Sequence, residues 1–201
     1  MTDRRRDPYQ RRARAAGYRA RSAYKLVELD RRFGLLRGGD FVVDLGASPG
    51  GWLQVVLERI GPRGRVVGVD VAALEPFAAS NVLLVTGDVR EPATIQTVRD
   101  SLGRRADVVL SDLAPKLTGV RATDEARCGE LAAATLDALP TLLRPGGRLL
   151  MKIFMGPEHE ALLAHMRQHF VELQTTRPEA TRRGSRELYT AGLEYRSPIR
   201  K

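Results

Sequence analysis

The sequence predicts an α/β fold, with a mostly parallel sheet and helices on both of its faces. Short apolar runs of strand length alternate with longer segments of helical periodicity, and this order produces a parallel sheet. The first apolar run ends in a glycine-rich turn, Gly46-x-x-x-Gly50-Gly51, and a helix follows directly. A strand, a tight turn and a helix in this order form the first half of a βαβ nucleotide-binding unit. A chain of 201 residues is long enough for one domain with its own core.

From residue 41 onward, the alternation of apolar patterns predicts seven strands and four helices. The parallel strands are predicted at Phe41–Leu45, Val66–Val69, Val82–Thr86, Val108–Leu110 and Arg148–Ile153. Helices are predicted between them over 51–60, 91–102 and 124–143. The Arg144-Pro145-Gly146-Gly147 segment indicates a helix stop and a turn into the fifth strand. A helix over 158–168 and strands over 170–176 and 186–194 follow, so the sheet is expected to end in an antiparallel pair.

The net charge of +9 is concentrated at the two ends of the chain. Residues 1–25 hold eight Arg and one Lys against two Asp, and residues 177–201 hold six Arg and one Lys against three Glu. The chain between these ends is close to neutral. A near-neutral body with two basic ends is typical of a protein that binds a polyanion such as a nucleic acid. Basic termini that only maintain solubility are the alternative.

Residues 1–19 form an Arg-rich arm with no apolar periodicity, in which Tyr9 and Tyr18 are interleaved. We expect this arm to be flexible on its own and to become ordered against phosphates, with tyrosine stacking on a base. Residues 20–201 are predicted to form a single domain without internal repeats. The apolar spacing from Ser22 to Phe33 predicts a helix at its start.

Several classes of protein and site are disfavoured by what the sequence lacks. No apolar run reaches the ~18 residues of a membrane span, and the N-terminus lacks a secretory signal. A single cysteine, Cys128, gives no internal disulfide, so a cytoplasmic location is expected. Asp3 and Asp7 disfavour a mitochondrial transit peptide, because such peptides are poor in acids. His165 and His169 have i, i+4 spacing without a third ligand, so no metal site is predicted.

One aspartate stands at the end of each of four successive predicted strands: Asp44, Asp70, Asp88 and Asp112. Ligands of doubly wound sheets bind beyond the carboxyl ends of the strands, so these acids are expected at the ligand site. The acid after the second strand can accept both ribose hydroxyls of an adenosine, and the acid after the third can accept from the adenine amino group. Helix N-capping is an alternative for Asp88 or Asp112.

The glycine-rich turn does not have the Gly-x-Gly-x-x-Gly spacing of dinucleotide binding. A nucleoside site without a pyrophosphate loop favours S-adenosylmethionine, whose amine and carboxylate would contact the turn around Gly46, Gly50 and Gly51. Trp52, directly after the turn, is placed either to pack against that ligand or to pack in the core.

Four further residues and their contexts complete a recognisable pattern: Lys25 in Arg21–Leu26, Asp112 in Ser111–Pro115, Lys152 in Met151–Phe154 and Glu187 in Ser185–Tyr189. Together with Asp44–Trp52, these contexts resemble the FtsJ/RrmJ (RlmE) family of ribose 2'-O-methyltransferases. The resemblance runs from about residue 20 to residue 195 and includes the Lys-Asp-Lys-Glu tetrad of that family in order.

The resemblance implies a Rossmann-like, S-adenosylmethionine-dependent methyltransferase fold and methyl transfer to a ribose 2'-hydroxyl. Compact bacterial members act on a uridine of large-subunit (23S) ribosomal RNA, so that RNA within the large ribosomal subunit is the implied partner of a monomeric enzyme. The implied cofactor contacts are Asp44, Gly46, Gly50, Gly51, Trp52, Asp70, Asp88 and Asp112. The implied catalytic residues are Lys25, Asp112, Lys152 and Glu187. One departure is Lys116-Leu117, where an Asn commonly follows the proline, and it puts local substrate contacts in doubt.

Within the tetrad, Lys152 is implied to be the proton acceptor. A free lysine has a pKa near ~10.4, so burial or a neighbouring cation must lower it towards ~7–8 before the amine can act as a base at neutral pH. Burial in the apolar run around Lys152 and repulsion by Lys25 act in that direction, whereas Asp112 opposes them and is expected to orient the amine. Lys25 and Glu187 are expected to hold the sugar hydroxyl in line for transfer. A strand-end lysine that reaches solvent is the alternative.

Three other functions remain open at this point. The RNA could be a transfer RNA or an organellar ribosomal RNA. The chain could be a non-catalytic RNA-binding protein with a degenerate cofactor pocket, although the acids and both lysines are present. An NAD(P)-dependent oxidoreductase is disfavoured by the spacing of the glycine-rich turn.

Overall fold

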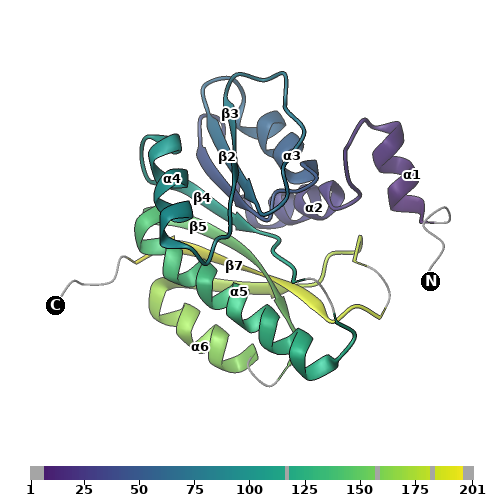
Figure 1. The fold of residues 1–201 in the computed structure, drawn as a ribbon, viewed down its shortest axis with the longest axis vertical. Helices are drawn as coiled ribbons and strands as arrows, with labels where there is room; N and C mark the ends of the chain where they lie inside the picture. Colours follow the sequence, from purple (N-terminus) through teal and green to yellow (C-terminus); the bar gives the residue numbers. More distant parts are fainter. Residues whose placement is uncertain (1–6, 116–117, 157–158, 182–183, 197–201) are drawn as a thin grey trace.

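A computed structural model describes residues 7–115, 118–156, 159–181 and 184–196 (Figure 1). Its centre is a seven-stranded sheet with the strand order β3-β2-β1-β4-β5-β7-β6. The strands are β1 (Phe41–Leu45), β2 (Arg65–Asp70), β3 (Val82–Thr86), β4 (Ala106–Ser111), β5 (Leu143–Phe154), β6 (Phe170–Thr176) and β7 (Glu187–Tyr195). The first five are parallel, and β7 runs antiparallel to both β5 and β6. The predicted fold class and the antiparallel pair are therefore confirmed.

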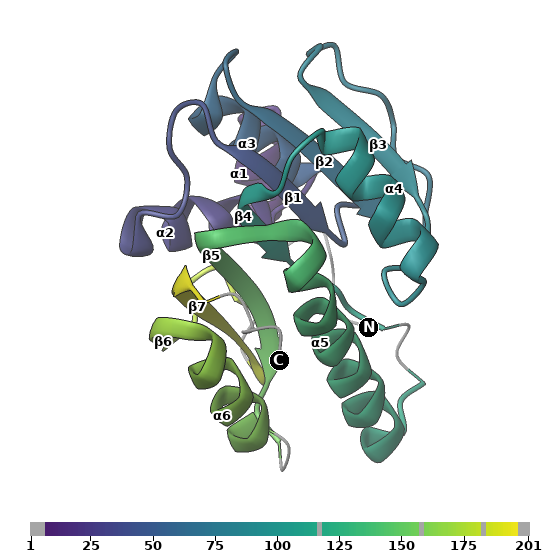
Figure 2. The ribbon, with the colours of Figure 1, turned by 90° about the vertical axis from the view of Figure 1, so that its left-hand side faces the viewer.

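Helices cover both faces of the sheet, as predicted. Within the described residues they are α1 (Pro8–Ala15), α2 (Ala23–Phe33), α3 (Gly51–Ile60), α4 (Pro92–Leu102), α5 (Arg121–Leu142) and α6 (His159–His169). Alternate residues of β1 show the two-sided burial: Val43 packs in a core with α4, α5 and α6, whereas Val42 packs in a second core with α2 and α3. Figure 2 shows α5 and α6 together on their side of the sheet.

The segment from Arg144 to Gly147 differs from its prediction as a turn between helix and strand. β5 begins at Leu143, directly after α5, because the buried Leu143 already pairs with Ala106 of β4. The ladder then shifts register and resumes at Val108 and Arg148. The proline and glycines are absorbed as an irregularity within the strand.

The N-terminal arm also differs from expectation, because residues 8–15 form α1. Asp7 caps this helix by accepting from the backbone N–H of Tyr9 at 3.0 Å, and Pro8 occupies the first turn. Ala13 is fully buried, and the Arg21 guanidinium forms an ion pair with Asp7. α1 lies beside α2 (Figure 1). The sequence analysis assigned no helix here, although the Asp-Pro start was a readable signal. Flexibility of the arm on its own stays a prediction.

Two acid–arginine clusters fasten the amino ends of the strands. Arg148 is 5% exposed and donates to both carboxylate oxygens of Asp40, at 3.0 and 2.9 Å, and to the Leu35 carbonyl at 2.5 Å. Asp107 accepts from Arg144 Nε at 2.6 Å and from Arg104 at 2.7 Å. Burial lowers the pKa of the Arg148 guanidinium, with Asp40 opposing the shift. The loops before β1 and β4 are thereby locked to the sheet.

Asp40→Ala is expected to lower the free energy of unfolding by about 3–5 kcal/mol, because it leaves the Arg148 guanidinium buried without its partner. The double variant Asp40→Ala/Arg148→Met should lose less, since it removes both charges. Urea denaturation measures both. A double variant less stable than the single variant would contradict the assignment of the loss to an unpaired charge.

Candidate active site

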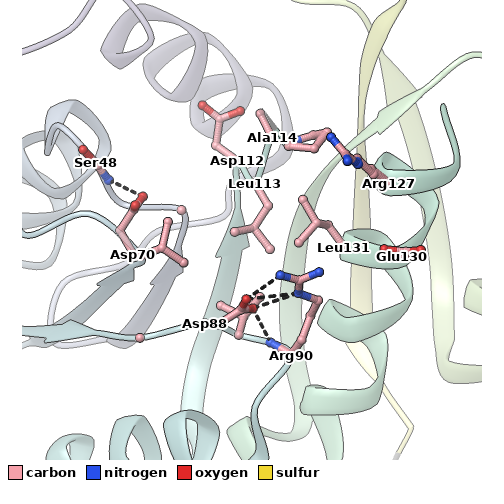
Figure 3. Close-up of a pocket in the computed structure, with 15 residues that line it drawn as sticks. Ser48, Asp70, Asp88, Arg90, Asp112, Leu113, Ala114, Arg127, Glu130 and Leu131 are labelled. Atoms are coloured by element: carbon pink, nitrogen blue, oxygen red, sulfur yellow. Dashed lines mark hydrogen bonds and ion pairs between the residues drawn. The ribbon is translucent and has the colours of Figure 1, made fainter. Parts of the chain in front are cut away.

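A pocket of about 490 Å³ opens at the carboxyl ends of β1, β2 and β4, where the sequence places its aspartates (Figure 3). It is lined by Gly46, Ser48, Asp70, Val71, Gly87, Asp88, Val89, Arg90, Asp112, Leu113, Ala114, Pro115, Arg127, Glu130 and Leu131. Of the eight predicted cofactor contacts, Gly46, Asp70, Asp88 and Asp112 line it. α5 closes one side with Arg127, Glu130 and Leu131.

The turn after β1 is held close to the neighbouring strand ends. The backbone N–H groups of Gly46 and Ala47 both donate to the Val69 carbonyl, at 2.9 and 3.1 Å. Gly46 has φ +83°, and a Cβ there would lie 3.0 Å from the backbone nitrogen of Leu113. Any side chain would therefore meet the backbone that follows β4, so glycine is required at this wall of the pocket.

Asp70 organises the second wall through its backbone contacts. Its Oδ2 accepts from Ser48 N–H at 3.0 Å, and its Oδ1 accepts from Ala72 N–H at 2.9 Å. The acid thus ties the β1 turn to the start of the loop after β2 (Figure 3). The next residue, Val71, is 71% exposed and lines the pocket. An exposed apolar side chain beside an acid is a suitable contact for the face of a ligand's aromatic ring. Val71 was not predicted as a site residue from the sequence.

Asp88 lines the pocket but is already paired. Its carboxylate receives hydrogen bonds from Arg90 Nε at 3.0 and 3.1 Å and from Nη2 at 2.6 Å. These bonds to Arg90 are the main reason that the pKa of Asp88 is lowered. A ligand that uses Asp88 would share it with Arg90, a partner that the sequence analysis did not identify.

Asp44 lies behind the pocket and is fully buried, and neither carboxylate oxygen has a hydrogen-bond partner among the described residues. Desolvation is the main cause of its strongly raised pKa, and the charges of Asp112 and Asp70 add to it. A buried, unpaired carboxyl beside two pocket-lining acids is a costly arrangement. It fits a site completed by a bound, positively charged ligand.

Gly50, Gly51 and Trp52 do not line the pocket, although all three were predicted to contact the cofactor. Gly50 (φ +107°) and Gly51 pack against the segment that precedes α2. Trp52 is 3% exposed, donates from Nε1 to the Ser22 carbonyl at 2.9 Å and belongs to the core with α2 and α3. The structure thus places Trp52 in the core, one of the two positions that the sequence left open.

The predicted tetrad comes together beside the pocket. Lys152 Nζ lies 2.7 Å from the Asp112 carbonyl oxygen and 2.9 Å from Asp112 Oδ1. Lys25, on the first turn of α2, forms an ion pair with Glu187 at the start of β7. Both lysine side chains are nearly buried, at 11% exposed for Lys25 and 7% for Lys152. Residues from four elements far apart in the chain thus form two adjacent acid–base pairs.

Tyr189 joins these two pairs, and the sequence analysis did not assign it a role. Its hydroxyl donates to Asp112 Oδ1 at 2.8 Å and accepts from Lys25 Nζ at 3.4 Å. It stands opposite Lys152 in the β5–β7 ladder, and its ring centroid lies 5.9 Å from that of Trp52. Burial, followed by the charges of Asp112 and Glu187, raises the pKa of the phenol well above its usual value. The period-two spacing from Glu187 was the available signal, since it puts Tyr189 on the same strand face.

α5 is linked to the tetrad by charge. Arg186 forms an ion pair with Glu125 and donates to the Met155 carbonyl, which connects α5, the end of β5 and the start of β7. Burial raises the pKa of the Cys128 thiol, while the charge of Lys152 acts against this shift. Cys128 is therefore near the tetrad, but it makes no hydrogen bond with it in the described structure.

The sequence model of the FtsJ-like methyltransferase family matches residues 18–195. The chain belongs to this family. Membership confirms the resemblance expected from the tetrad and the glycine-rich turn, and it gives the chain S-adenosylmethionine as its cofactor. The pocket fits that molecule through its ring of acids, the unpaired Asp44 and the bare backbone at Gly46.

Relatives of this FtsJ-like chain include proteins named ribosomal RNA large subunit methyltransferase E. The Halobacterium salinarum protein is 47% identical over 192 residues, which cover 95% of this chain and 74% of the relative. The Methanothermobacter thermautotrophicus protein is 40% identical over 98% of this chain and 93% of its own length. Among solved structures, a protein of Plasmodium falciparum described as a ribosomal RNA methyltransferase aligns with a TM-score of 0.78 at 27% identity, over 89% of this chain and 98% of that one. Aeropyrum pernix fibrillarin, at 20% identity and a TM-score of 0.59, over 86% of this chain and 76% of that one, shares the fold.

Within the described residues of this FtsJ-like chain, no helix combines the length and apolarity needed to cross a membrane. Among the same residues, no three His, Cys, Asp or Glu side chains form a group that could hold a metal ion. His165 and His169 contact each other, with their Nε2 atoms 3.1 Å apart. Lys116-Leu117, the departure from the family pattern, lies outside the described residues.

Asp44→Asn is expected to stabilise the cofactor-free protein increasingly as the pH rises from 4 to 8. The raised pKa means that the folded state binds this proton more tightly than the unfolded state does. The stabilisation that comes from this tighter proton binding is fully present below the unfolded pKa of about 3.9 and is lost as the pH rises above it. Asparagine has no such stabilisation to lose. The readout is the difference in Tm between variant and wild type across this range.

Asp124→Asn is the matched control with the opposite sign. Hydrogen bonds from the Thr118 backbone and hydroxyl lower the pKa of Asp124, so its contribution is present above the unfolded pKa and lost on acidification. The Asp124 variant should therefore lose Tm relative to wild type as the pH rises to about 5, and the difference should stay constant above that pH. A Tm difference for Asp44→Asn that does not change with pH would contradict the buried, unpaired carboxyl.

Proposed function

We propose that this protein transfers a methyl group from S-adenosylmethionine to the ribose 2'-hydroxyl of a uridine in large-subunit (23S) ribosomal RNA. The observation that carries the proposal is the Lys152 amine, nearly buried and held by Asp112, a residue that also lines the pocket. The relatives named for the large-subunit RNA support the choice of substrate.

S-adenosylmethionine supplies an electrophilic methyl group on a sulfonium sulfur. Asp70 is the proposed acceptor for the ribose hydroxyls of the cofactor, and Val71 is the proposed contact for its adenine ring. Asp88 would face the adenine edge while Arg90 keeps it ionised. The acids Asp44 and Asp112 would face the cationic end of the cofactor. Gly50, Gly51 and Trp52 support the turn from behind.

The contacts of Lys152 orient its amine for proton transfer. A neutral amine has two N–H donors and one lone pair. The Asp112 carbonyl at 2.7 Å and Asp112 Oδ1 at 2.9 Å can take both donors, which leaves the lone pair for the proton of the ribose hydroxyl. Asp112 is therefore the proposed orienting group of Lys152, and Tyr189 fixes the other side of that carboxylate by its 2.8 Å hydrogen bond.

Lys25 and Glu187 are proposed to bind the sugar. Their ion pair lies on the α2 and β7 side of the tetrad, and Tyr189 connects it to Asp112. One donor and one acceptor held side by side can bind a ribose hydroxyl through both of its hydrogen-bonding functions. Positioning of the nucleophile is expected to supply much of the rate acceleration, because the methyl donor is already activated.

The RNA is proposed to approach over α1 and α2. Arg11, Arg12 and Arg14 are exposed on α1, which has no acid in its first turn. The Arg12 guanidinium lies 4.9 Å from the centroid of the Tyr24 ring, and Tyr24 precedes Lys25 on α2. The basic surface therefore continues to the tetrad. It is attached to the body by the Asp7–Arg21 ion pair and by the Tyr18 hydroxyl, which donates to Glu58 at 2.9 Å.

Lys152→Ala is expected to keep S-adenosylmethionine affinity within about twofold and to lose at least ~100-fold in methyl transfer, the usual scale of general base catalysis. Lys152→Arg places a guanidinium at this position, which stays protonated and has no lone pair to accept the proton, so it should be equally inactive. Isothermal titration calorimetry measures the affinity, and label transfer to ribosomal RNA followed by nucleotide mapping measures the reaction. Turnover unchanged in either variant would remove Lys152 from the base role. If label is found only in transfer RNA, transfer RNA replaces ribosomal RNA as the proposed substrate.

Arg11→Glu/Arg14→Glu is expected to weaken RNA binding and to reduce the slope of log K against log salt by up to about 1.4–1.8, since each lost phosphate contact removes ~0.7–0.9. Arg63→Glu/Arg65→Glu is the matched control, because these two exposed arginines lie at the amino end of β2, opposite the site. Filter binding across a salt series measures both slopes. Equal slopes in the two variants would make the α1 arginines a solubility feature.

A further inference from the structure

Arg19 connects the segment before α2 with two loops that border the cofactor pocket. Its guanidinium donates to the Glu75 carbonyl at 2.8 Å and to the Pro76 carbonyl at 2.7 Å, and it lies 3.8 Å from the centroid of the Phe77 ring. Its backbone N–H donates to Gln54 of α3 at 2.7 Å. The methyltransfer chemistry does not use this residue.

The other side of Arg19 faces the glycine-rich turn. A Cβ at Gly50 would lie 2.9 Å from Phe77, 3.0 Å from Arg19 Nη1 and 3.1 Å from Arg19 Cδ. The side chain therefore fills the space between Gly50 and the 74–77 segment. One arginine fixes the distance between the turn after β1 and the loop after β2.

The loop after β2, residues 71–81, has few other anchors. It contains no helix or strand, and most of its residues are exposed. Leu74 and Phe77 are its partly buried apolar side chains, and they pack against the core with α2 and α3. The same loop begins with Val71, which lines the cofactor pocket directly after Asp70. The position of that wall thus depends on how the distal part of the loop is held.

We propose that Arg19 is a positioning residue for the cofactor pocket, which sets the affinity for S-adenosylmethionine by holding the 71–81 loop against the Gly50 turn. This inference rests on the proposed binding of the cofactor at Asp70 and Val71. Arg19 is the last residue of the basic N-terminal segment 1–19. The proposal therefore assigns one residue of this segment to cofactor binding, whereas the arginines of α1 are proposed to bind RNA.

The chemistry of the contact requires arginine. Two adjacent carbonyls are bound by two N–H groups of one planar fork, and the face of the same plane covers an aromatic ring. Lysine has a single ammonium and no plane, so it cannot reproduce all three contacts. Arg19→Lys is therefore a sharp test that retains the charge.

Arg19→Ala and Arg19→Lys are expected to weaken S-adenosylmethionine binding by about tenfold, which corresponds to ~1.4 kcal/mol and to the loss of one charge-assisted hydrogen bond. The KM for S-adenosylmethionine should rise by a similar factor, while kcat at saturating cofactor stays within twofold. A general structural defect would instead lower kcat and the Tm of the cofactor-free protein. Arg63→Ala, which changes an exposed arginine in the turn between α3 and β2, should leave the affinity unchanged.

Phe77→Ala combined with Arg19→Ala completes a double-variant cycle, whose two single effects on affinity should not add because the side chains act as one unit. Asp70→Ala reports separately on the cofactor site itself. If Asp70→Ala lowers the affinity and Arg19→Ala does not, the positioning role is overturned while the proposed function stands. If Asp70→Ala leaves the affinity unchanged, the proposed cofactor location fails, and the Arg19 inference fails with it.

Discussion

Asp112 accepts hydrogen bonds from two sides, and the site depends on this convergence. Its carbonyl and carboxylate oxygens both lie within hydrogen-bond distance of Lys152, and Tyr189 donates to the same Oδ1. Its own backbone N–H donates to the Leu45 carbonyl of β1 at 3.0 Å. The residue also lines the pocket. One aspartate at a strand end thereby couples the turn that borders the cofactor to the amine proposed to take the proton.

The charges around Asp112 are arranged at a cost to the free protein. Asp44, Asp70 and Asp112 interact unfavourably, and the first of them is buried without a partner. A fold selected for stability alone would replace Asp44 by an apolar residue. Retention of the acid is reasonable if a cationic ligand completes the site, because the stability lost in the empty state then becomes binding energy. The function proposed here explains an otherwise unfavourable residue.

The sequence alone predicted the sheet well, because strands buried on both faces are nearly continuous apolar runs. The resemblance to the FtsJ-like family implied Lys25, Asp112, Lys152 and Glu187 as one cluster, and the structure brings these four residues together. The sequence did not assign Tyr189 a role, since a buried tyrosine in a strand is indistinguishable from a core residue until its hydroxyl has a partner. Sequence patterns report periodicity and strand ends, but not the contacts between side chains from distant elements.

Three other differences have the same origin. The α1 helix is short and basic, and its stability depends on docking through Ala13 and Arg21, which no periodicity reveals. The pairing of Asp88 with Arg90 was not predicted, because it depends on the side-chain conformation of a half-exposed arginine. Gly50 and Gly51 were predicted as cofactor contacts, but their close neighbours are Arg19, Ala20 and Phe77.

The acid–arginine clusters at Arg148–Asp40 and Asp107 lie at the amino ends of the strands, whereas the pocket lies at their carboxyl ends. The ion pairs that fasten the fold and the residues proposed for catalysis therefore lie at opposite ends of the strands. Mutations that remodel substrate choice around the pocket can accumulate without loosening the edge that secures the architecture. Such a division allows one scaffold to diverge towards new RNA targets while its folding remains intact.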